Sequence, residues 1–128
     1  MASTRTKTIT YWASTGLLAF VLLSAGFAYL ASRDEALAGM AQLGYPAYVL
    51  GILTLWKVAG GVVILAPRLP RLKEWAYAGA VFDFTGAAAS HLARGNSAGH
   101  VIVPLVLTIV VLVSWATRPA ARTLRANP

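Results

Sequence analysis

Four long apolar stretches constrain the fold of this 128-residue chain more than any other feature. A helix needs about 20 apolar residues, within a range of about 17 to 25, to cross a bilayer. Because lipid offers the backbone no hydrogen-bond partners, such stretches cross it as helices. The first three are long enough, and the fourth becomes so when His100 or Thr117 is drawn into the interface. The stretches cover roughly residues 11–30, 45–65, 75–92 and 101–115.

We therefore predict an all-α fold, a four-helix transmembrane bundle that forms a single domain over residues 1–128. The composition agrees, since 58% of the residues are hydrophobic and 12% are charged, against about 25% charged in soluble proteins. The apolar core of the first stretch is longer than the about 7 to 15 residues of a signal peptide, so we expect an uncleaved span.

Charge and cysteine content exclude several classes of function. The net charge is +7, but most of the cations flank the apolar stretches and form no basic stripe with interleaved aromatic residues, so we expect lipid and no nucleic acid as the partner. The chain has no cysteine, which excludes disulfides, thiolate metal sites, iron-sulfur clusters and a cysteine redox relay. Any redox chemistry would need a bound cofactor to carry the electrons.

The distribution of cations predicts the orientation. By the positive-inside rule, the side that holds most lysine and arginine faces the cytoplasm, and here it holds both termini. Only Arg33 and Arg94 lie on the opposite, outer side. The cytoplasmic set is Arg5, Lys7, Arg68, Arg71, Lys73, Arg118, Arg122 and Arg125.

The first outer loop has helical signals of its own. Ser32 and Glu35 have the spacing of a capping box, and Gly44 supplies a stop. We predict a short interfacial helix, with a solvated helical loop as the open alternative. The residues that would give this helix an apolar side are Leu37, Met40, Ala41 and Leu43.

Two opposite charges interrupt the apolar stretches, Lys57 in the second and Asp83 in the third. A charge at the centre of a bilayer costs about 2.5 to 3.5 kcal/mol, so it needs a partner, a wet cavity or a function. Pro67 and Pro70 end one helix and begin the next, which makes the two spans antiparallel neighbours. Both charges then lie about 12 Å from the cytoplasmic edge, and we predict an ion pair. Whether it serves chemistry or only fixes packing stays open.

Small residues share the faces of these two charges. Gly60 and Gly61 lie one turn from Lys57, and Gly79 and Gly86 lie one turn from Asp83. Because small residues let helix backbones approach closely in a membrane, we predict tight packing of the second span on the third through these glycines.

A polar track continues from Asp83 toward the outer side. Ser90 and His91 lie near the face of Asp83, and His100 follows a short turn. The track could admit a proton, a quinone head group or a small polar ligand, although hydrogen-bonding or lipid-facing histidines are the simpler interpretation. Both histidines sit at one end without acidic partners, which argues against haem and against a metal site. No catalytic motif is present, so we expect no independent catalytic activity.

Several stretches carry a family resemblance. They are Leu43–Pro46, Trp56–Gly61, Leu65–Gly79, Phe82–Ala87 and the pair Ser90-His91. With them the chain resembles the DoxX-like family of small bacterial integral membrane proteins. The resemblance implies a multi-pass protein of the cell inner membrane and a link to quinone-dependent or thiol-stress redox systems. Many relatives look as though they carry an acidic residue where this chain has Lys57.

Three functions remain open at this stage. The first is a redox-associated subunit that binds quinone between the second and third spans, at Lys57, Asp83 or His91. The second is a non-catalytic structural or assembly subunit that docks another membrane or redox subunit. The third is a small proton-coupled transporter, which is disfavoured because the first span holds no charge. A homo-oligomer is compatible with all three.

Overall fold

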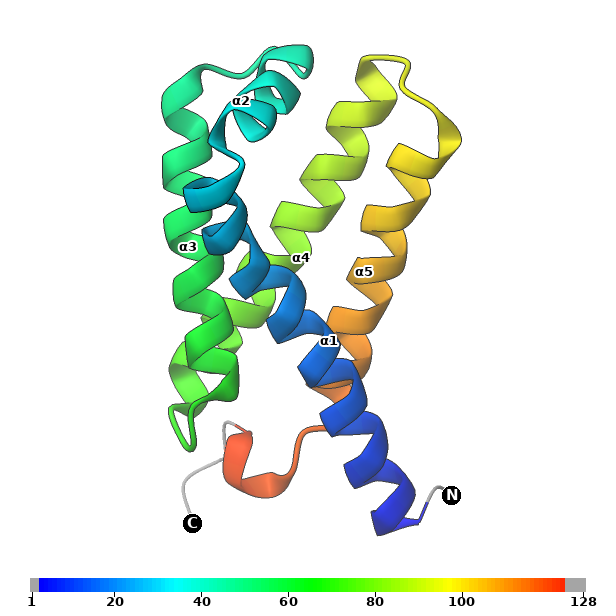
Figure 1. Ribbon diagram of the computed structural model, residues 1–128. Helices are drawn as coiled ribbons and strands as arrows, with labels where there is room; N and C mark the ends of the chain where they lie inside the picture. Colours follow the sequence, from blue (N-terminus) through cyan, green and yellow to red (C-terminus); the bar gives the residue numbers. More distant parts are fainter. Residues whose placement is uncertain (1–2, 124–128) are drawn as a thin grey trace.

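The computed structural model describes residues 3–123, and within this range it is entirely helical, without a strand. This confirms the all-α prediction. Arg125, one of the cations used to predict orientation, lies outside the described residues. The elements are α1 (Thr4–Ala31), α2 (Arg33–Gln42), α3 (Ala47–Leu65), α4 (Pro70–Ala93), α5 (Ala98–Ala116) and the short 3-10 helix η1 (Ala120–Arg122) (Figure 1).

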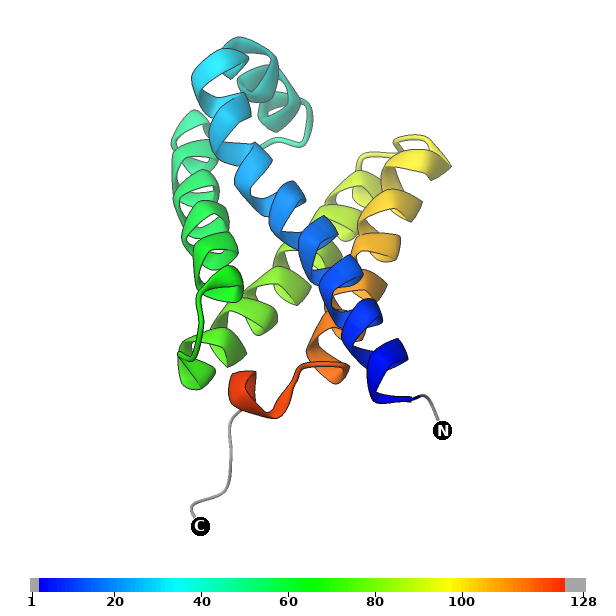
Figure 2. The same cartoon turned by 60° about the horizontal axis from the view of Figure 1, so that its bottom comes forward.

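The four long helices pack around one core, with α1 running obliquely across the others. Helices α1 and α4 each contact both α3 and α5. Figures 1 and 2 show both chain ends and the α3–α4 connection at one end of the molecule, here called the terminal end. Helix α2 and the α4–α5 connection form the opposite end, the α2 end. From their connection, α3 and α4 diverge toward the α2 end in both views.

Three of the described helices, α1, α3 and α5, are long and apolar enough to cross a membrane. The fourth predicted stretch is therefore long enough after all, because its helix extends to residues 98–116. Helix α4 is not among the three, although it has 24 residues. Its charged first turns, its alanine-rich composition and Asp83 make it less apolar than the others.

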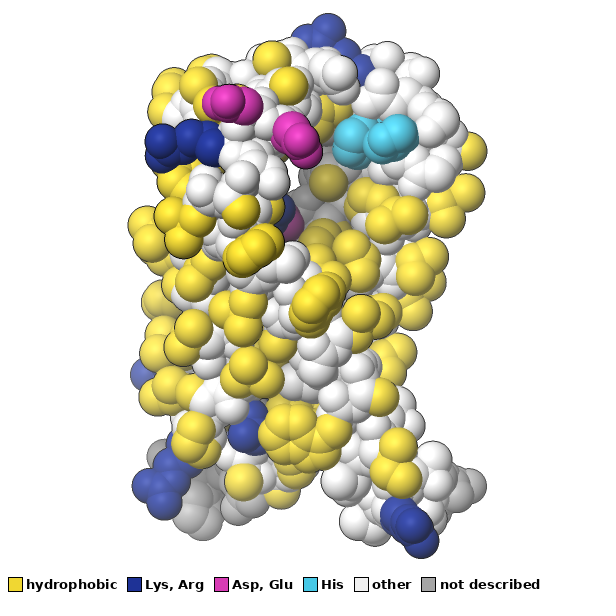
Figure 3. Space-filling view, viewed as in Figure 1, with side chains coloured by type: hydrophobic (Ala, Val, Ile, Leu, Met, Phe, Trp, Pro, Cys, Tyr) yellow, Lys and Arg dark blue, Asp and Glu magenta, His cyan; other side chains and the backbone are white. Residues whose placement is uncertain are grey.

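The core is formed where the four long helices face one another, and large apolar side chains also cover the outside. Phe20, Phe27 and Trp75 are each more than 70% exposed, and apolar side chains dominate the surface in Figure 3. Water would disfavour so much apolar surface, whereas lipid accepts it. The buried core cluster comprises Leu18, Leu22, Ile64, Tyr77, Ala80, Phe84 and Val111.

A buried hydroxyl network joins three helices near the terminal end. The hydroxyl of Ser114 on α5 lies 2.6 Å from that of Thr15 on α1 and 2.8 Å from that of Tyr77 on α4. All three side chains are buried. Buried hydroxyls must be paired, because leaving one unsatisfied costs about 1 to 3 kcal/mol. The network therefore fixes how α1, α4 and α5 meet.

Two cations close the end of α3. The last carbonyls of a helix lack partners within the helix and favour positive charge. Arg122 donates to the carbonyls of Ile64 at 3.0 Å and Ala66 at 3.1 Å. Lys73 donates to the carbonyls of Val63, at 2.6 Å, and Ala66. Burial, reinforced by the nearby Arg122 cation, lowers the pKa of Lys73 to about 8; this residue precedes the predicted span 75–92.

The α3–α4 connection forms the antiparallel hairpin that the prolines predict. Helix α3 ends at Leu65, and Pro70 is the first residue of α4. Between them Arg68 and Leu69 adopt left-handed backbone conformations, with φ of 64° and 55°. Residues with a Cβ rarely adopt this region because of steric strain, and here they make the reversal sharp.

Helix α2 begins after Ser32 as predicted, but the capping box does not form. The Ser32 side chain makes no capping hydrogen bond, and its φ of −137° and ψ of 42° turn it away from the usual cap geometry. Asp34 and Glu35 in the first turn still favour the positive helix end. Gly44, with φ of 84°, supplies the predicted stop, and the Arg94 side chain packs closely against it.

Candidate functional site

Lys57 on α3 and Asp83 on α4 form the predicted ion pair. The Lys57 Nζ lies 3.5 Å from the Asp83 Oδ2. Their side chains remain 30% and 17% exposed, so the pair is only partly enclosed by protein. The prediction held because the proline hairpin fixes the register of the two helices, which places both charges at the same depth.

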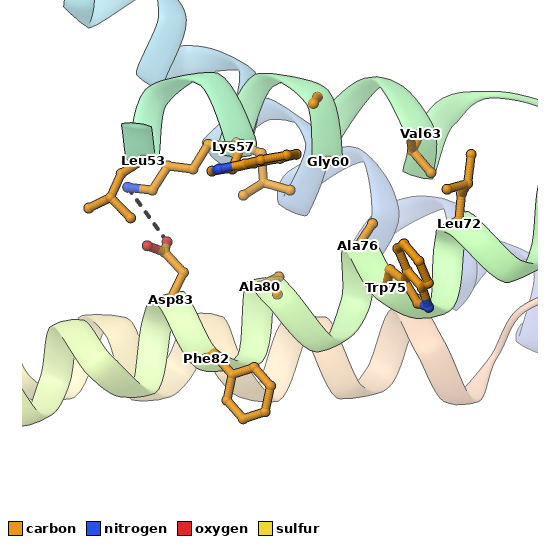
Figure 4. Close-up of a pocket in the computed structure, with 14 residues that line it drawn as sticks. Leu53, Lys57, Gly60, Val63, Leu72, Trp75, Ala76, Ala80, Phe82 and Asp83 are labelled. Atoms are coloured by element: carbon orange, nitrogen blue, oxygen red, sulfur yellow. Dashed lines mark ion pairs between the residues drawn. The ribbon is translucent and has the colours of Figure 1, made fainter. Parts of the chain in front are cut away.

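The ion pair lies at one end of a cavity of about 550 Å³ between α3 and α4. Figure 4 shows the pair at one end, Val63, Leu72 and Trp75 toward the other, and Gly60, Ala76 and Ala80 between them. Apart from Lys57 and Asp83, every lining side chain is apolar. The full lining is Leu22, Leu53, Trp56, Lys57, Ala59, Gly60, Val63, Leu72, Trp75, Ala76, Gly79, Ala80, Phe82 and Asp83.

The cavity corrects the predicted tight packing of α3 on α4. A Cβ atom added at Gly60, Gly79 or Gly86 would meet nothing within 4 Å, so these glycines do not serve as contact points between the two helices. The physical reason is the divergence of α3 and α4 from their hairpin, which separates these faces (Figure 1).

Gly61 does pack closely, but against α1. A Cβ there would lie 2.9 Å from the Leu23 Cδ2 and 3.3 Å from the Leu22 Cβ. On α1, Gly26 approaches α3 in the same way, with 2.8 Å to a Val58 methyl. The close approach of small residues therefore joins α1 to α3 and leaves the α3–α4 side free for the cavity.

Ser90 and His91 lie near the α2 end and do not line the cavity. The Ser90 hydroxyl donates to the Gly86 carbonyl and lies 2.5 Å from the Tyr45 hydroxyl. The His91 Nδ1 lies 2.8 Å from the Asn96 amide nitrogen. These side chains therefore tie the end of α4 to the neighbouring loops, and the structure does not bring them to the ion pair.

His100 completes a histidine pair with His91, whose ring centroids are 5.2 Å apart. In Figure 3 the histidine side chains lie beside a hollow at the α2 end, across from acidic side chains. Within residues 3–123, no three His, Cys, Asp or Glu side chains gather closely enough to hold a metal ion.

Two groups of residues have roles in the structure that the sequence patterns did not indicate. The first is the cavity wall formed by Trp56 and Trp75, to which the sequence alone assigned no role in a site. The second is the hydroxyl network, whose signal was the presence of Thr15 and Ser114 within apolar stretches. A polar side chain inside a span needs a partner, but the sequence does not say which helix supplies it.

The helical fold, the apolar surface and the three helices long enough to span a bilayer define an integral membrane protein of the all-α class. The sequence model described as the DoxX-like family matches residues 13–114. The chain therefore belongs to the DoxX-like family, as the resemblance implied. No curated protein and no solved structure matches it.

Proposed function

We propose that this chain is a four-span protein of the cell inner membrane that binds a quinone in the α3–α4 cavity and serves as the membrane subunit of a redox system. The spans lie within helices α1, α3, α4 and α5, that of α4 over about residues 75–92, and α2 lies at the outer interface. Cytoplasmic termini are supported by the cations at the terminal end, which include Arg5, Lys7, Arg68 and Arg71.

Insertion of α4, the least apolar of these helices, is supported by the ion pair. An isolated Asp83 would cost several kcal/mol in lipid, and a partner of opposite charge lowers this cost. Lys57 and Asp83 together carry no net charge, so α3 and α4 enter the bilayer more favourably as a hairpin than separately.

The observation that carries the proposal is an ion pair at the end of an otherwise apolar cavity. Small-molecule sites typically enclose about 300 to 1,000 Å³ with apolar walls and a few polar groups that fix orientation, and this cavity of about 550 Å³ fits that description. Lys57 can donate a hydrogen bond to a carbonyl oxygen, and Asp83 can accept one from a hydroxyl.

A bound quinone supplies reversible two-electron, two-proton chemistry. The chain's own part is to hold the ring, to orient one carbonyl toward Lys57, and to exchange a proton at the Asp83 carboxylate. Because the chain has no cysteine, we propose that a partner subunit passes the electrons.

A structural role of the same pair is the second candidate. Lys57 and Asp83 bridge α3 and α4 at a place where the cavity otherwise separates them. The pair could then fix the spacing of the helices for assembly with another subunit, with no ligand bound.

The test measures the binding of a short-chain benzoquinone to the full chain in nanodiscs. Binding is detected by the quenching of tryptophan fluorescence. Asp83→Asn keeps the side-chain volume but leaves Lys57 without its counter-ion, so we expect binding to weaken by about tenfold or more, which corresponds to about 1.4 kcal/mol. Asp34→Asn is the control, because this carboxylate lies on α2 and is exposed.

Quinone binding, measured beside stability, separates the two candidates. The reversed pair, Lys57→Asp with Asp83→Lys, should restore the stability that each single change loses under both candidates. Saturable binding by the natural chain, lost in Asp83→Asn, supports the quinone site. No saturable binding by any of these proteins, together with rescue of stability by the reversal, would leave only the structural role.

A further inference from the structure

We infer that Gly60 and Gly79 determine the specificity of the α3–α4 cavity, by keeping open a slot for a flat, neutral ring that enters sideways from the bilayer. The inference rests on the proposed function and names the class of ligand and its route. The divergence of α3 and α4 opens the cavity, and the two glycines keep its middle free of side chains.

Small side chains form the middle of both walls. Gly60 and its neighbour Ala59 lie on α3, and Ala76, Gly79 and Ala80 lie on α4. Protein interiors are otherwise close-packed, with few voids larger than a water molecule. A Cβ at Gly60 or Gly79 would meet no neighbouring atom, so any larger side chain at these positions can occupy the cavity itself. The space between two such helix walls suits a ring inserted edge-on.

The charges at the end of the slot favour a neutral head group. A carboxylate such as that of a fatty acid would be attracted by Lys57 but repelled by Asp83, and an amine the reverse, so neither gains a counter-ion without breaking the existing pair. A neutral group that both accepts and donates hydrogen bonds matches both members of the pair. The slot therefore discriminates against charged amphiphiles of similar length.

The route is lateral. Trp56 and Trp75 line the cavity and yet are 67% and 71% exposed, so they stand at its rim, where apolar surface faces lipid. Toward the terminal end the hairpin and the hydrogen bonds of Lys73 and Arg122 to the carbonyls of α3 close the space. A ligand with an apolar tail can therefore leave the tail in the bilayer while its ring reaches Lys57.

The test compares leucine substitutions at three glycines, at each of which an added Cβ would meet no atom within 4 Å. Gly60→Leu and Gly79→Leu place a side chain in the slot, and Gly86→Leu places one on α4 outside the cavity. In nanodiscs, affinity for the short-chain benzoquinone should fall by about tenfold to a hundredfold in the first two variants, since overfilling a packed site displaces its occupant. Gly86→Leu should bind as the natural chain does, and Gly79→Ala should show a smaller loss.

Two further measurements complete the experiment. Replacement of Trp56 and Trp75 by Phe should remove the saturable part of the quenching, because Trp12 and Trp115 do not line the cavity. Decanoate and decylamine should not compete with the quinone at equal concentration.

The outcomes are distinguishable. If the natural chain binds quinone and Gly79→Leu binds it equally well, or if decanoate competes, the slot is wrong and the proposed function stands. If the natural chain shows no saturable quinone binding, both fail.

Discussion

The terminal end and the α3–α4 side of this molecule are built in opposite ways. At the terminal end, hydrogen bonds of Ser114, Arg118 and Arg122 reach across to other helices. On the α3–α4 side, an ion pair joins the two helices at one end of a cavity with apolar walls. Helices α3 and α4 take part in both regions, so the contrast depends on position along these helices.

This difference shows how a small membrane protein can keep an open site without losing its fold. Ligand-binding sites generally lie in the locally less stable parts of a structure. Here the hairpin, the hydroxyl network and the cations over the end of α3 hold the helices at one end. The helices are then free to diverge above it, where the cavity lies.

The largest effect is expected from breaking the terminal end. Ser114→Ala removes the shared partner of Thr15 and Tyr77, so the free energy of unfolding should fall by about 1 to 3 kcal/mol. Thermal unfolding in detergent would measure this. Ser24→Ala is the control, because Ser24 bonds only a carbonyl of its own helix. Equal stability of the two variants would show that the network does not hold this end.

Two adjacent glycines sharpen the comparison with opposite signs. Gly61→Ala should lower the free energy of unfolding by roughly 1 kcal/mol or more, because the new Cβ collides with Leu23 of α1. Gly60→Ala should raise it by up to about 1 kcal/mol, because alanine favours the helix and nothing blocks it here. The same unfolding assay on both variants checks this, and a loss at Gly60 would mean that α3 and α4 close together in the membrane.

A further prediction concerns the pH dependence of stability at the terminal end. The pKa of Lys73 is lowered to about 8 by burial and by Arg122, whereas an unfolded lysine titrates near about 10.4. Between these values the unfolded chain holds more protons at Lys73, so the free energy of unfolding should rise with pH across this window. Chemical denaturation from pH 7 to 10.5 would show the slope. Lys73→Met should have a flatter profile, and an identical profile would contradict the assignment.

The sequence was sufficient for the helices, the hairpin and the Lys57–Asp83 pair, because each follows from local signals and from the antiparallel register that Pro67 and Pro70 impose. It was not sufficient for the partners of the glycines. Gly60 and Gly61 are neighbours in sequence but point to different sides of α3, and periodicity does not say which side meets α1. The Ser32 cap failed for a similar reason, since the backbone conformation at the α1–α2 joint overrides the local motif.

The length of α1 has a consequence for how the protein senses its surroundings. Its 28 residues extend about 42 Å, so its polar first residues reach beyond the about 30 Å of a hydrocarbon core, and its oblique course across the other helices (Figure 1) tilts it in a bilayer. Its first half is bonded to α5 through Thr15 and its second half is wedged against α3 at Gly61. A thinner or thicker bilayer would change the tilt of α1. Because α1 contacts both α3 and α5, a change in its tilt would change the distance between α3 and the α4–α5 pair. Lipid thickness should thus adjust the width of the α3–α4 cavity, and with it the binding of the proposed ligand.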